Sequence, residues 1–111
     1  MARGVRLDKP WEPLTPEAAE AVGGYLGVYQ LGDAGGSVVR IGYAGGSSRF
    51  GLRGVLAEHA ARHDAESFRY EVTTAYLSRY RELLMLHVAD HGRLPEANAD
   101  EPGRVGRLRP S

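Results

Sequence analysis

The chain has 111 residues, of which 42% are hydrophobic and 25% charged, so its composition is that of one globular domain and excludes global disorder. Its 14 basic and 14 acidic residues give a formal net charge of zero, which excludes the overall basic field that draws a protein onto DNA non-specifically. The absence of cysteine excludes disulfides and thiolate zinc sites, and no segment has the roughly 20 apolar residues of a membrane span or the pattern of a signal peptide, so we expect a soluble, cytoplasmic protein.

Both ends of the chain are expected to be appendages of one central domain, residues 15–98. Residues 1–14 mix charges and two prolines around Trp11, which predicts an extended N-terminal arm whose tryptophan packs on the domain. Residues 99–111 contain two prolines, two glycines and three arginines, which predicts a flexible C-terminal tail.

The first predicted element of the domain is a helix. Thr15-Pro16-Glu17 supplies a hydroxyl N-cap, a proline at the first helical position and an acid in the first turn, and Gly23-Gly24 ends the helix. Residues 25–31 and 37–43 are rich in aromatic and β-branched side chains and flank a glycine-rich turn. This pattern predicts a β-hairpin.

A second helix, a third strand and a final helix follow the hairpin. The second helix has about a dozen residues, and its inward face is predicted from the i, i+3, i+4, i+7 spacing of Leu52, Val55, Leu56, His59, Ala60 and His63. Residues 67–74 alternate apolar and polar side chains, which predicts a strand with one solvated side, and residues 75–91 form a helix that ends at Gly92. The fold class is therefore expected to be α+β, with a small three-stranded, mainly antiparallel sheet flanked by helices.

Tyr29 and Glu82 are the first candidates for chemistry. A phenol in a strand is usually structural, and its pKa near 10 makes Tyr29 a poor base unless a cation or a metal-bound hydroxide assists it. Glu82 precedes the apolar residues 83–86, which predicts a segment buried nearly all round, so its carboxylate needs a partner. That partner is either an arginine such as Arg79 or a divalent cation held with waters and a substrate phosphate, and the sequence leaves both open.

The histidines and arginines are weaker indicators of function. His59 lies on the apolar face of its helix, where a lone histidine is more often a core residue than a catalyst. His87 and His91 have the one-turn spacing that suits zinc, but no third ligand is evident. Seven arginines lie between residues 37 and 81 against four acids. Arginine suits phosphate contacts, although a general compositional bias explains the same count.

The order of these motifs resembles the GIY-YIG nuclease superfamily. Gly27-Val28-Tyr29 and Arg40-Ile41-Gly42 are separated by an eleven-residue step, and an arginine and a histidine on a helix, Glu82 and Asn98 follow in that order. The similarity spans about residues 25–98. It implies a small antiparallel sheet flanked by helices and hydrolysis of nucleic acid with the help of one divalent ion.

The resemblance also implies roles for individual residues. Tyr29 would help to deprotonate the attacking water, Glu82 would hold a single Mg²⁺ or Mn²⁺ ion, and an arginine with His59 would steady the scissile phosphate. Asn98 would brace the site. The ion would act as a Lewis acid and a source of hydroxide. The residues placed at the site in this way are the catalytic candidates Tyr29, Tyr43, Arg53 and His59, the substrate-binding candidates Arg40, Arg49 and Asn98, and the metal ligand Glu82.

Two positions depart from the family's pattern. Arg40 stands where the second motif has a tyrosine, and Tyr43, just beyond the glycine, offers a phenol from another direction. The usual arginine position, four residues before the histidine, is Val55. Arg53 lies some 200° away around the helix at ~100° per residue, so it can substitute only from a loosened first turn. Arg49, in the preceding loop, is the other candidate.

Three functional hypotheses follow. The first is a divalent-metal-dependent endonuclease, with DNA as the expected substrate. The alternatives are a module of the same fold that binds nucleic acid without strong catalysis, or a protein-interaction domain. A domain of this size usually gains its targeting from a homodimer or a partner protein, and we expect no membrane partner.

Overall fold

The central hairpin sets the arrangement of the molecule, because helices pack on both of its faces. The computed structural model describes residues 5–99. In chain order the elements are β1 (Glu12–Pro13), α1 (Pro16–Ala21), β2 (Gly27–Gly32), β3 (Val38–Ala44), α2 (Gly51–Arg62), β4 (Ser67–Val72), α3 (Tyr76–His91) and α4 (Glu96–Ala99). The α+β class and the order of the predicted helices and strands are confirmed.

The sheet has four antiparallel strands in the order β1-β4-β2-β3, so the prediction of three strands is wrong. The additional strand, β1, comes from the predicted N-terminal arm, where Glu12 pairs with Phe68 and Pro13 with Ser67. A two-residue strand is too short to show the alternation of a strand, and its proline lacks a backbone N–H donor, so the sequence pattern did not indicate it. The strand at the opposite edge is β3.

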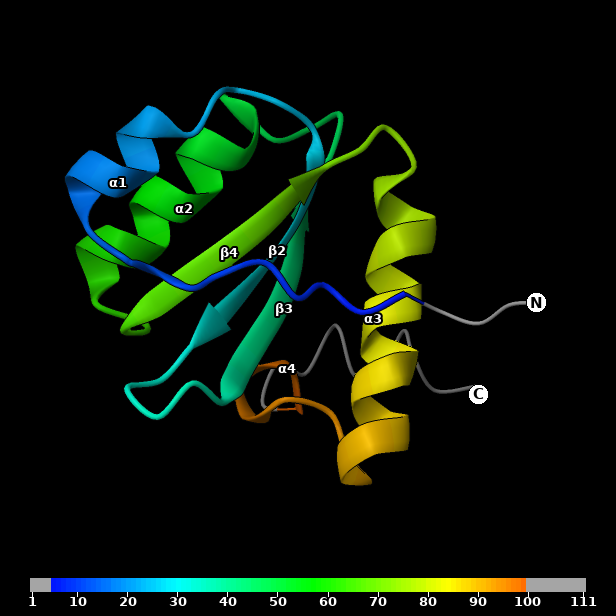
Figure 1. Ribbon diagram of the computed structural model, residues 1–111. Helices are drawn as coiled ribbons and strands as arrows, with labels where there is room; N and C mark the ends of the chain where they lie inside the picture. Colours follow the sequence, from blue (N-terminus) through cyan, green and yellow to red (C-terminus); the bar gives the residue numbers. More distant parts are fainter. Residues whose placement is uncertain (1–4, 100–111) are drawn as a thin grey trace.

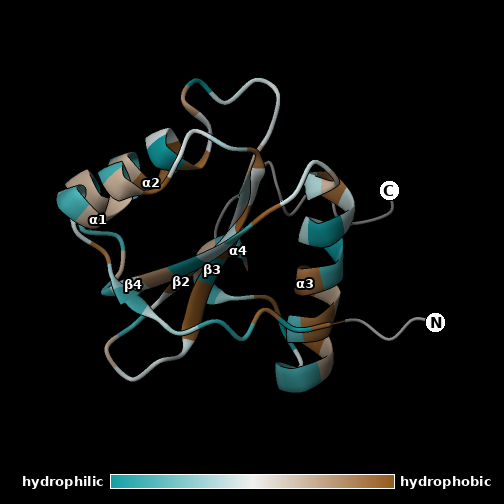
Figure 2. Cartoon of the chain, turned by 45° about the horizontal axis from the view of Figure 1, so that its top comes forward, coloured by the Kyte–Doolittle hydropathy of each residue, from teal (hydrophilic) through white to brown (hydrophobic). Residues whose placement is uncertain are grey.

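The helices and the sheet form three layers, with α1 and α2 on one face of the sheet and α3 on the other (Figure 1). The core on the α2 side is made of Ala19, Val22, Tyr29, Leu31, Ala44, Leu52, Leu56 and Phe68. The core on the α3 side is made of Leu7, Val28, Ile41, Tyr80, Leu83 and Leu84. Figure 2 shows hydrophobic stretches along the central strands between these helices. Successive residues of β2 and β3 therefore belong to different faces.

The long helix α3 buries only one side. Leu83 and Leu84 are 2% and 3% exposed, but Met85 is 70% exposed and Leu86 is intermediate. The expectation that residues 83–86 are buried nearly all round is therefore wrong. The reason is that α3 packs on the sheet as a surface helix, so residues one position apart point about 100° apart and only a stripe reaches the core.

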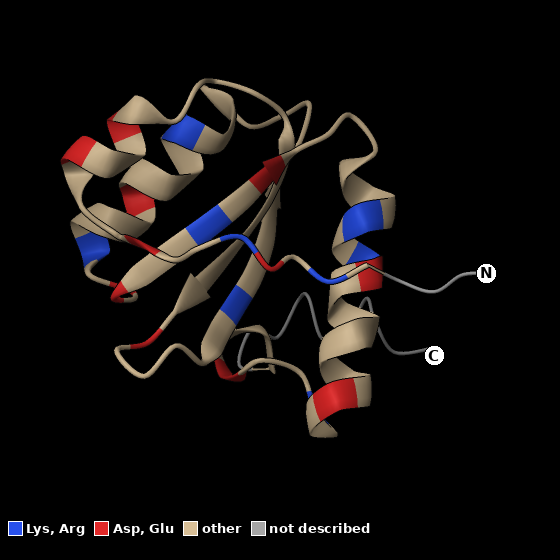
Figure 3. Cartoon of the chain, in the orientation of Figure 1, with Lys and Arg blue, Asp and Glu red and all other residues tan. Residues whose placement is uncertain are grey.

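The N-terminal segment crosses β4 and α3 and is held there by side chains. Arg6 forms an ion pair with Asp90 at 2.6 Å, and Arg79 donates to the carbonyl of Val5. Arg69 donates to the carbonyl of Lys9 at 3.1 Å, and its guanidinium lies over the Trp11 ring at 4.1 Å. Figure 3 shows basic and acidic bands side by side where this segment meets α3. The predicted packing of Trp11 on the domain is confirmed.

Parts of the predicted appendages lie outside the described residues. These are residues 1–4 of the arm and residues 100–111 of the tail, including its three arginines. Within residues 5–99, no helix combines the length and the apolar character that crossing a bilayer requires.

Candidate functional site

Tyr29 is the residue around which the candidate site is built. It lies in β2 opposite Gly42 of β3 and belongs to the core on the α2 side. A Cβ atom at residue 42 would lie only 2.3 Å from the Tyr29 hydroxyl oxygen. Because β3 is an edge strand, the missing side chain at Gly42 lets the phenol extend over the margin of the sheet. Only 4% of Tyr29 is exposed.

The Tyr29 hydroxyl forms a hydrogen bond with His59 Nε2 at 2.8 Å, and His59 Nδ1 lies 2.7 Å from Asp64 Oδ2. A carboxylate can only accept, so Nδ1 carries the proton and Nε2 of the neutral ring accepts from the phenol. The three side chains thus form a chain of hydrogen bonds, which we call the Tyr29 relay. Its outer end is solvated, because Asp64 is exposed and also accepts from Arg62 at 3.3 Å.

The local sequence explains how Asp64 comes back to His59. His63 adopts the left-handed conformation at the end of α2, with φ 56°, and the Asp64 backbone N–H donates to the carbonyl of His59 at 3.1 Å. This C-terminal turn reverses the chain onto the last turn of the helix. The Asp64 carboxylate is thereby placed beside the imidazole of a residue five positions earlier.

The electrostatics of the relay keep the imidazole neutral. Burial lowers the pKa of His59 below its ordinary value, and the positive charges of Arg40 and Arg62 act in the same direction, while Asp64 opposes them. The hydrogen bond from His59 lowers the pKa of Asp64. A neutral imidazole next to an ionised carboxylate is the state that can take a proton from a phenol.

Arg40 is on the relay's side of the sheet. It pairs with Leu31, two residues from Tyr29 on the same strand face, and its charge reaches His59. Arg40 therefore puts a cation on the face of the sheet that carries the phenol.

Arg49 and Arg53 are placed elsewhere, at the start of α2. Their guanidinium carbons lie 5.5 Å and 5.8 Å from the centre of the Phe50 ring. Phe50, the N-cap of α2, has φ 52° and is 59% exposed. Arg53 and His59 are six residues apart, which is about 9 Å along a helix axis. The structure thus joins His59 with Tyr29 and sets the two arginines at a neighbouring end of the domain.

Tyr43 lies on the opposite face of the sheet from Tyr29. It pairs with Val28, and its ring stacks on Tyr76 at 5.7 Å and meets the edge of Tyr80 at 4.9 Å. The phenol that was expected to supplement Tyr29 thus belongs to an aromatic cluster under α3.

Glu82 is also on the α3 side of the sheet. Its Oε1 accepts from Arg79 Nη1 at 2.6 Å, and the same guanidinium binds Glu71 of β4 at 3.0 Å. Of the two partners that the sequence left open, the structure has the arginine. A divalent cation at Glu82 would compete with this guanidinium for the carboxylate and would lie on the opposite face of the sheet from the relay. This environment does not fit a metal centre that serves Tyr29, and residues 5–99 contain no cluster of three or more His, Asp or Glu side chains that could hold an ion.

Asn98 is fully buried on α4. Its Oδ1 accepts from the Ile41 N–H at 2.8 Å, and its Nδ2 donates to the Ile41 carbonyl at 2.9 Å. The amide thus pairs with the free edge of β3 as another strand would. This geometry agrees with the bracing role that the resemblance implies and leaves no surface of Asn98 for a substrate.

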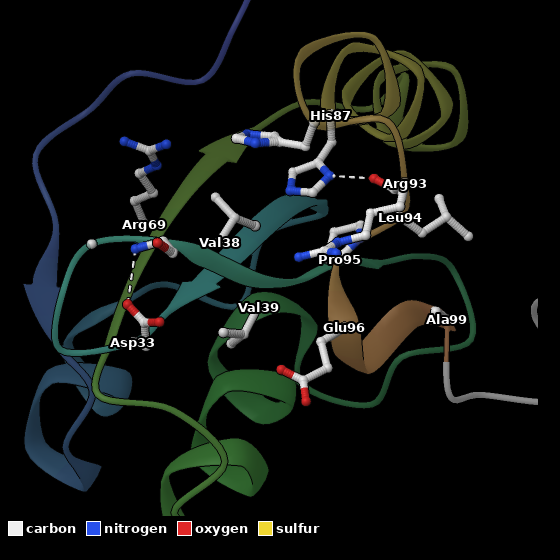
Figure 4. A pocket seen from close by; sticks show the side chains of 13 residues that line it. Asp33, Val38, Val39, Arg69, His87, Arg93, Leu94, Pro95, Glu96 and Ala99 are labelled. Carbon is white, nitrogen blue, oxygen red and sulfur yellow. Dashed lines mark hydrogen bonds between the residues drawn. The ribbon is translucent and has the colours of Figure 1, made fainter.

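A separate pocket of about 930 Å³ lies between β3, α4 and the end of α3 (Figure 4). His87 donates from Nδ1 to the Arg93 carbonyl at 2.9 Å, and burial lowers its pKa. The His87 and His91 rings are 4.3 Å apart. The pocket contains none of the predicted site residues and mixes charges of both signs.

Asp64 is the site residue that the sequence did not indicate. A carboxylate beyond the end of a helix follows no fixed spacing to a histidine inside it. The available signal was the short loop between α2 and β4, which keeps residues 63–66 close to the last helical turn.

Comparison with known proteins gives a family without a described activity. No curated protein and no solved structure shows significant similarity to the chain. A family model described as a domain of unknown function, DUF7508, matches residues 5–90. These residues include all elements from β1 through β4 in chain order and nearly all of α3. The chain belongs to the DUF7508 family.

Proposed function

We propose that this domain hydrolyses phosphodiester bonds in nucleic acid and that the Tyr29 relay supplies the base. The observation that carries the proposal is the pair of consecutive hydrogen bonds, 2.8 Å and 2.7 Å long, from Tyr29 through His59 to Asp64. A tyrosine alone is a poor base near neutral pH, but a phenol hydrogen-bonded to a neutral imidazole can pass its proton on as it accepts another.

The relay moves protons in one direction during the attack. The Tyr29 hydroxyl gives its proton to His59 Nε2 and takes one from the attacking water, while Asp64 stabilises the imidazolium that forms. Because Tyr29 is only 4% exposed, the proposal requires that the water reach the phenol where it passes Gly42 of the edge strand β3. Asp64 holds the ring in the required tautomer through Nδ1, as orienting carboxylates do in other sites. The water oxygen bonds to phosphorus as the P–O bond to the leaving group breaks, and the departing oxygen takes a proton from solvent. Arg40, on the same face, offsets negative charge that develops on the phosphate.

Metal dependence stays a prediction of the family resemblance. Glu82 pairs with Arg79 on the α3 side, so an ion there would not contact the relay. DNA rather than RNA as substrate rests on the same resemblance.

The test is cleavage of labelled single-stranded, duplex and branched DNA and of RNA, with and without Mg²⁺ or Mn²⁺. The variants are Tyr29→Phe, which removes only the hydroxyl, and Tyr70→Phe as the matched control. Tyr70 pairs with Tyr29 in the next strand and belongs to the same face. Loss of a general base costs about 10²- to 10⁴-fold in rate, so Tyr29→Phe should lose cleavage by at least 100-fold while Tyr70→Phe retains it.

Two results would contradict the proposal. One is that the wild-type protein leaves all four substrates intact in every metal condition. The other is that Tyr29→Phe cleaves at the wild-type rate, which would show that the relay is a structural network in the core.

A further inference from the structure

The end of the domain formed by residues 21–26, 45–53 and 72–77 exposes two aromatic side chains. Tyr25 and Phe50 are each 59% exposed. Their segments are in direct contact, because the Leu52 N–H donates to the Tyr25 carbonyl at 2.9 Å and a Cβ at Gly51 would lie 2.7 Å from that carbonyl oxygen. The two residues therefore lie at the same end of the domain, with the Tyr25 ring beside Gly23 and the Phe50 ring beside Gly54.

The position of the Phe50 ring is fixed by its backbone. Phe50 and Gly51 both have positive φ, 52° and 60°, and Gly51 packs against the backbone of Gly24 so closely that a Cβ there would lie 2.5 Å away. A bulky side chain is rarely held in this conformation. The packed Gly24–Gly51 contact maintains it and keeps the ring at the surface instead of in the core.

The charge of this end is positive. Arg49 and Arg53 hold their guanidinium groups within 6 Å of the Phe50 ring. The three segments that meet here contain no aspartate or glutamate. The flanking acids are Glu20, which is exposed on α1, and Glu71, which is bound to Arg79. Exposed aromatic side chains and arginines at one end of the domain complement a chain that carries both stackable rings and phosphates.

We infer that Tyr25, Arg49, Phe50 and Arg53 form a platform for single-stranded nucleic acid, with bases stacking on the rings and phosphates contacting the arginines. This inference rests on the proposed function and specifies its substrate class. Arg53 and His59 are on the same helix, about 9 Å apart along its axis.

The experiment measures binding without cleavage. Tyr29→Phe serves as the background, and fluorescence anisotropy follows labelled single-stranded and duplex oligonucleotides across a salt series. Phe50→Leu and Tyr25→Leu remove the rings, and Met85→Ala is the control for an exposed apolar residue on α3. Stacking on one ring corresponds to roughly a 5- to 100-fold change in affinity. Each ring variant should lose that much affinity for the single strand, with a smaller loss for the duplex.

Two further variants separate stacking from charge. Phe50→Trp should keep single-strand affinity and show quenched tryptophan fluorescence when the oligonucleotide binds. Arg49→Gln with Arg53→Gln should flatten the slope of log K against log salt by about 1.4, since each contact with a single strand contributes about 0.7. Arg81→Gln on α3 is the matched arginine control and should leave the slope unchanged.

The outcomes distinguish this inference from the proposed function. Wild-type affinity for single strands in both ring variants, or an equal loss for single strand and duplex, overturns the platform even if the wild-type protein cleaves nucleic acid. Ring-dependent binding of single strands by a protein that cleaves nothing supports the platform and overturns the proposed hydrolysis.

Discussion

The hydroxyl of Tyr29 occupies the space into which a side chain at residue 42 would project. A Cβ at Gly42 would lie 2.3 Å from both the Oη and the Cζ of Tyr29, which is far inside van der Waals contact. Glycine is thus required at this point of β3 by a side chain on the neighbouring strand. The requirement links the second motif of the sequence to the position of the phenol in the first.

Gly42→Ala should destabilise the domain and displace the phenol from His59. Overpacking of a core costs about 1 to 3 kcal/mol, and a contact this short belongs at the upper end. Urea unfolding measures the loss. Gly46→Ala is the control, because the nearest atom to its Cβ would be 3.8 Å away, and its cost should stay below about 0.5 kcal/mol. Equal stability of the two variants would show that Tyr29 does not depend on Gly42.

The stability of the domain should fall as the pH is lowered below about 6.5. Burial lowers the pKa of His59 in the folded state, so the unfolded chain binds more protons as the pH falls through the ordinary histidine range. One such proton gives a slope of at most about 1.4 kcal/mol per pH unit. The lowered pKa of Asp64 adds a second loss in more acidic solution.

His59→Gln isolates this contribution. Glutamine does not titrate, so the free energy of unfolding of this variant should depend less on pH between pH 7.5 and 5.5 than that of the wild-type protein. Urea unfolding at each pH measures the difference. His63→Gln, which changes an exposed histidine four residues away, should keep the wild-type slope. His87 remains in both variants and contributes equally. Parallel curves for wild type and His59→Gln would count against a neutral His59 in the core.

The elements that the sequence predicted are those with enough residues to show a period. The inward face of α2 follows from the helical spacing, and Leu52, Leu56, His59 and Ala60 are buried as predicted. Val55 is only half-buried, and the prediction is wrong for His63, which is exposed because the helix ends before it in a left-handed turn. Two elements were not predicted, β1 with two residues and α4 with four, because neither is long enough to repeat a pattern. Both depend on tertiary contacts, with Ser67 and Phe68 in one case and Ile41 in the other.

The sequence predicts the candidate site only where the alternation of residues along a strand, or the repeat of a helix, decides which side chains share a face. Tyr29 and His59 meet because the inward face of α2 covers the face of β2 that carries the phenol. Tyr43, one residue from Gly42, falls on the other face by the same alternation. No sequence pattern predicts that the Asp64 carboxylate binds His59. Likewise, none predicts that Arg79 binds both Glu71 and Glu82. Both arrangements depend on how the chain turns between elements.

Asn98→Ala should weaken the edge of the sheet. The variant leaves the N–H and the carbonyl of Ile41 without the partner that now binds both, and unpaired buried polar groups cost about 1 to 3 kcal/mol each. We expect a loss of about 2 to 4 kcal/mol in urea unfolding and faster hydrogen exchange of the Ile41 amide. Glu96→Gln, on the exposed side of the same short helix, should change neither quantity.

Arg79 and Glu82 should behave as one coupled unit in stability measurements. Arg79 is largely buried and serves Glu71, Glu82 and the Val5 carbonyl, so Arg79→Gln should cost about 2 to 3 kcal/mol. Glu82 is more exposed, and solvent screening limits the cost of Glu82→Gln to less than about 1 kcal/mol. A double-mutant cycle should give a coupling of about 0.5 to 1 kcal/mol between them.

The same variants decide between the two roles of Glu82. If its carboxylate belongs to the ion-pair network, Glu82→Gln should lower stability slightly and leave nucleic-acid cleavage and its metal dependence unchanged. If it holds a divalent ion instead, Glu82→Gln should abolish metal-dependent cleavage, and Arg79→Gln, which frees the carboxylate, should tighten the binding of Mn²⁺. Calorimetric titration of Mn²⁺ into the wild-type protein and both variants measures that difference directly, because the network gives no heat of binding in any of the three.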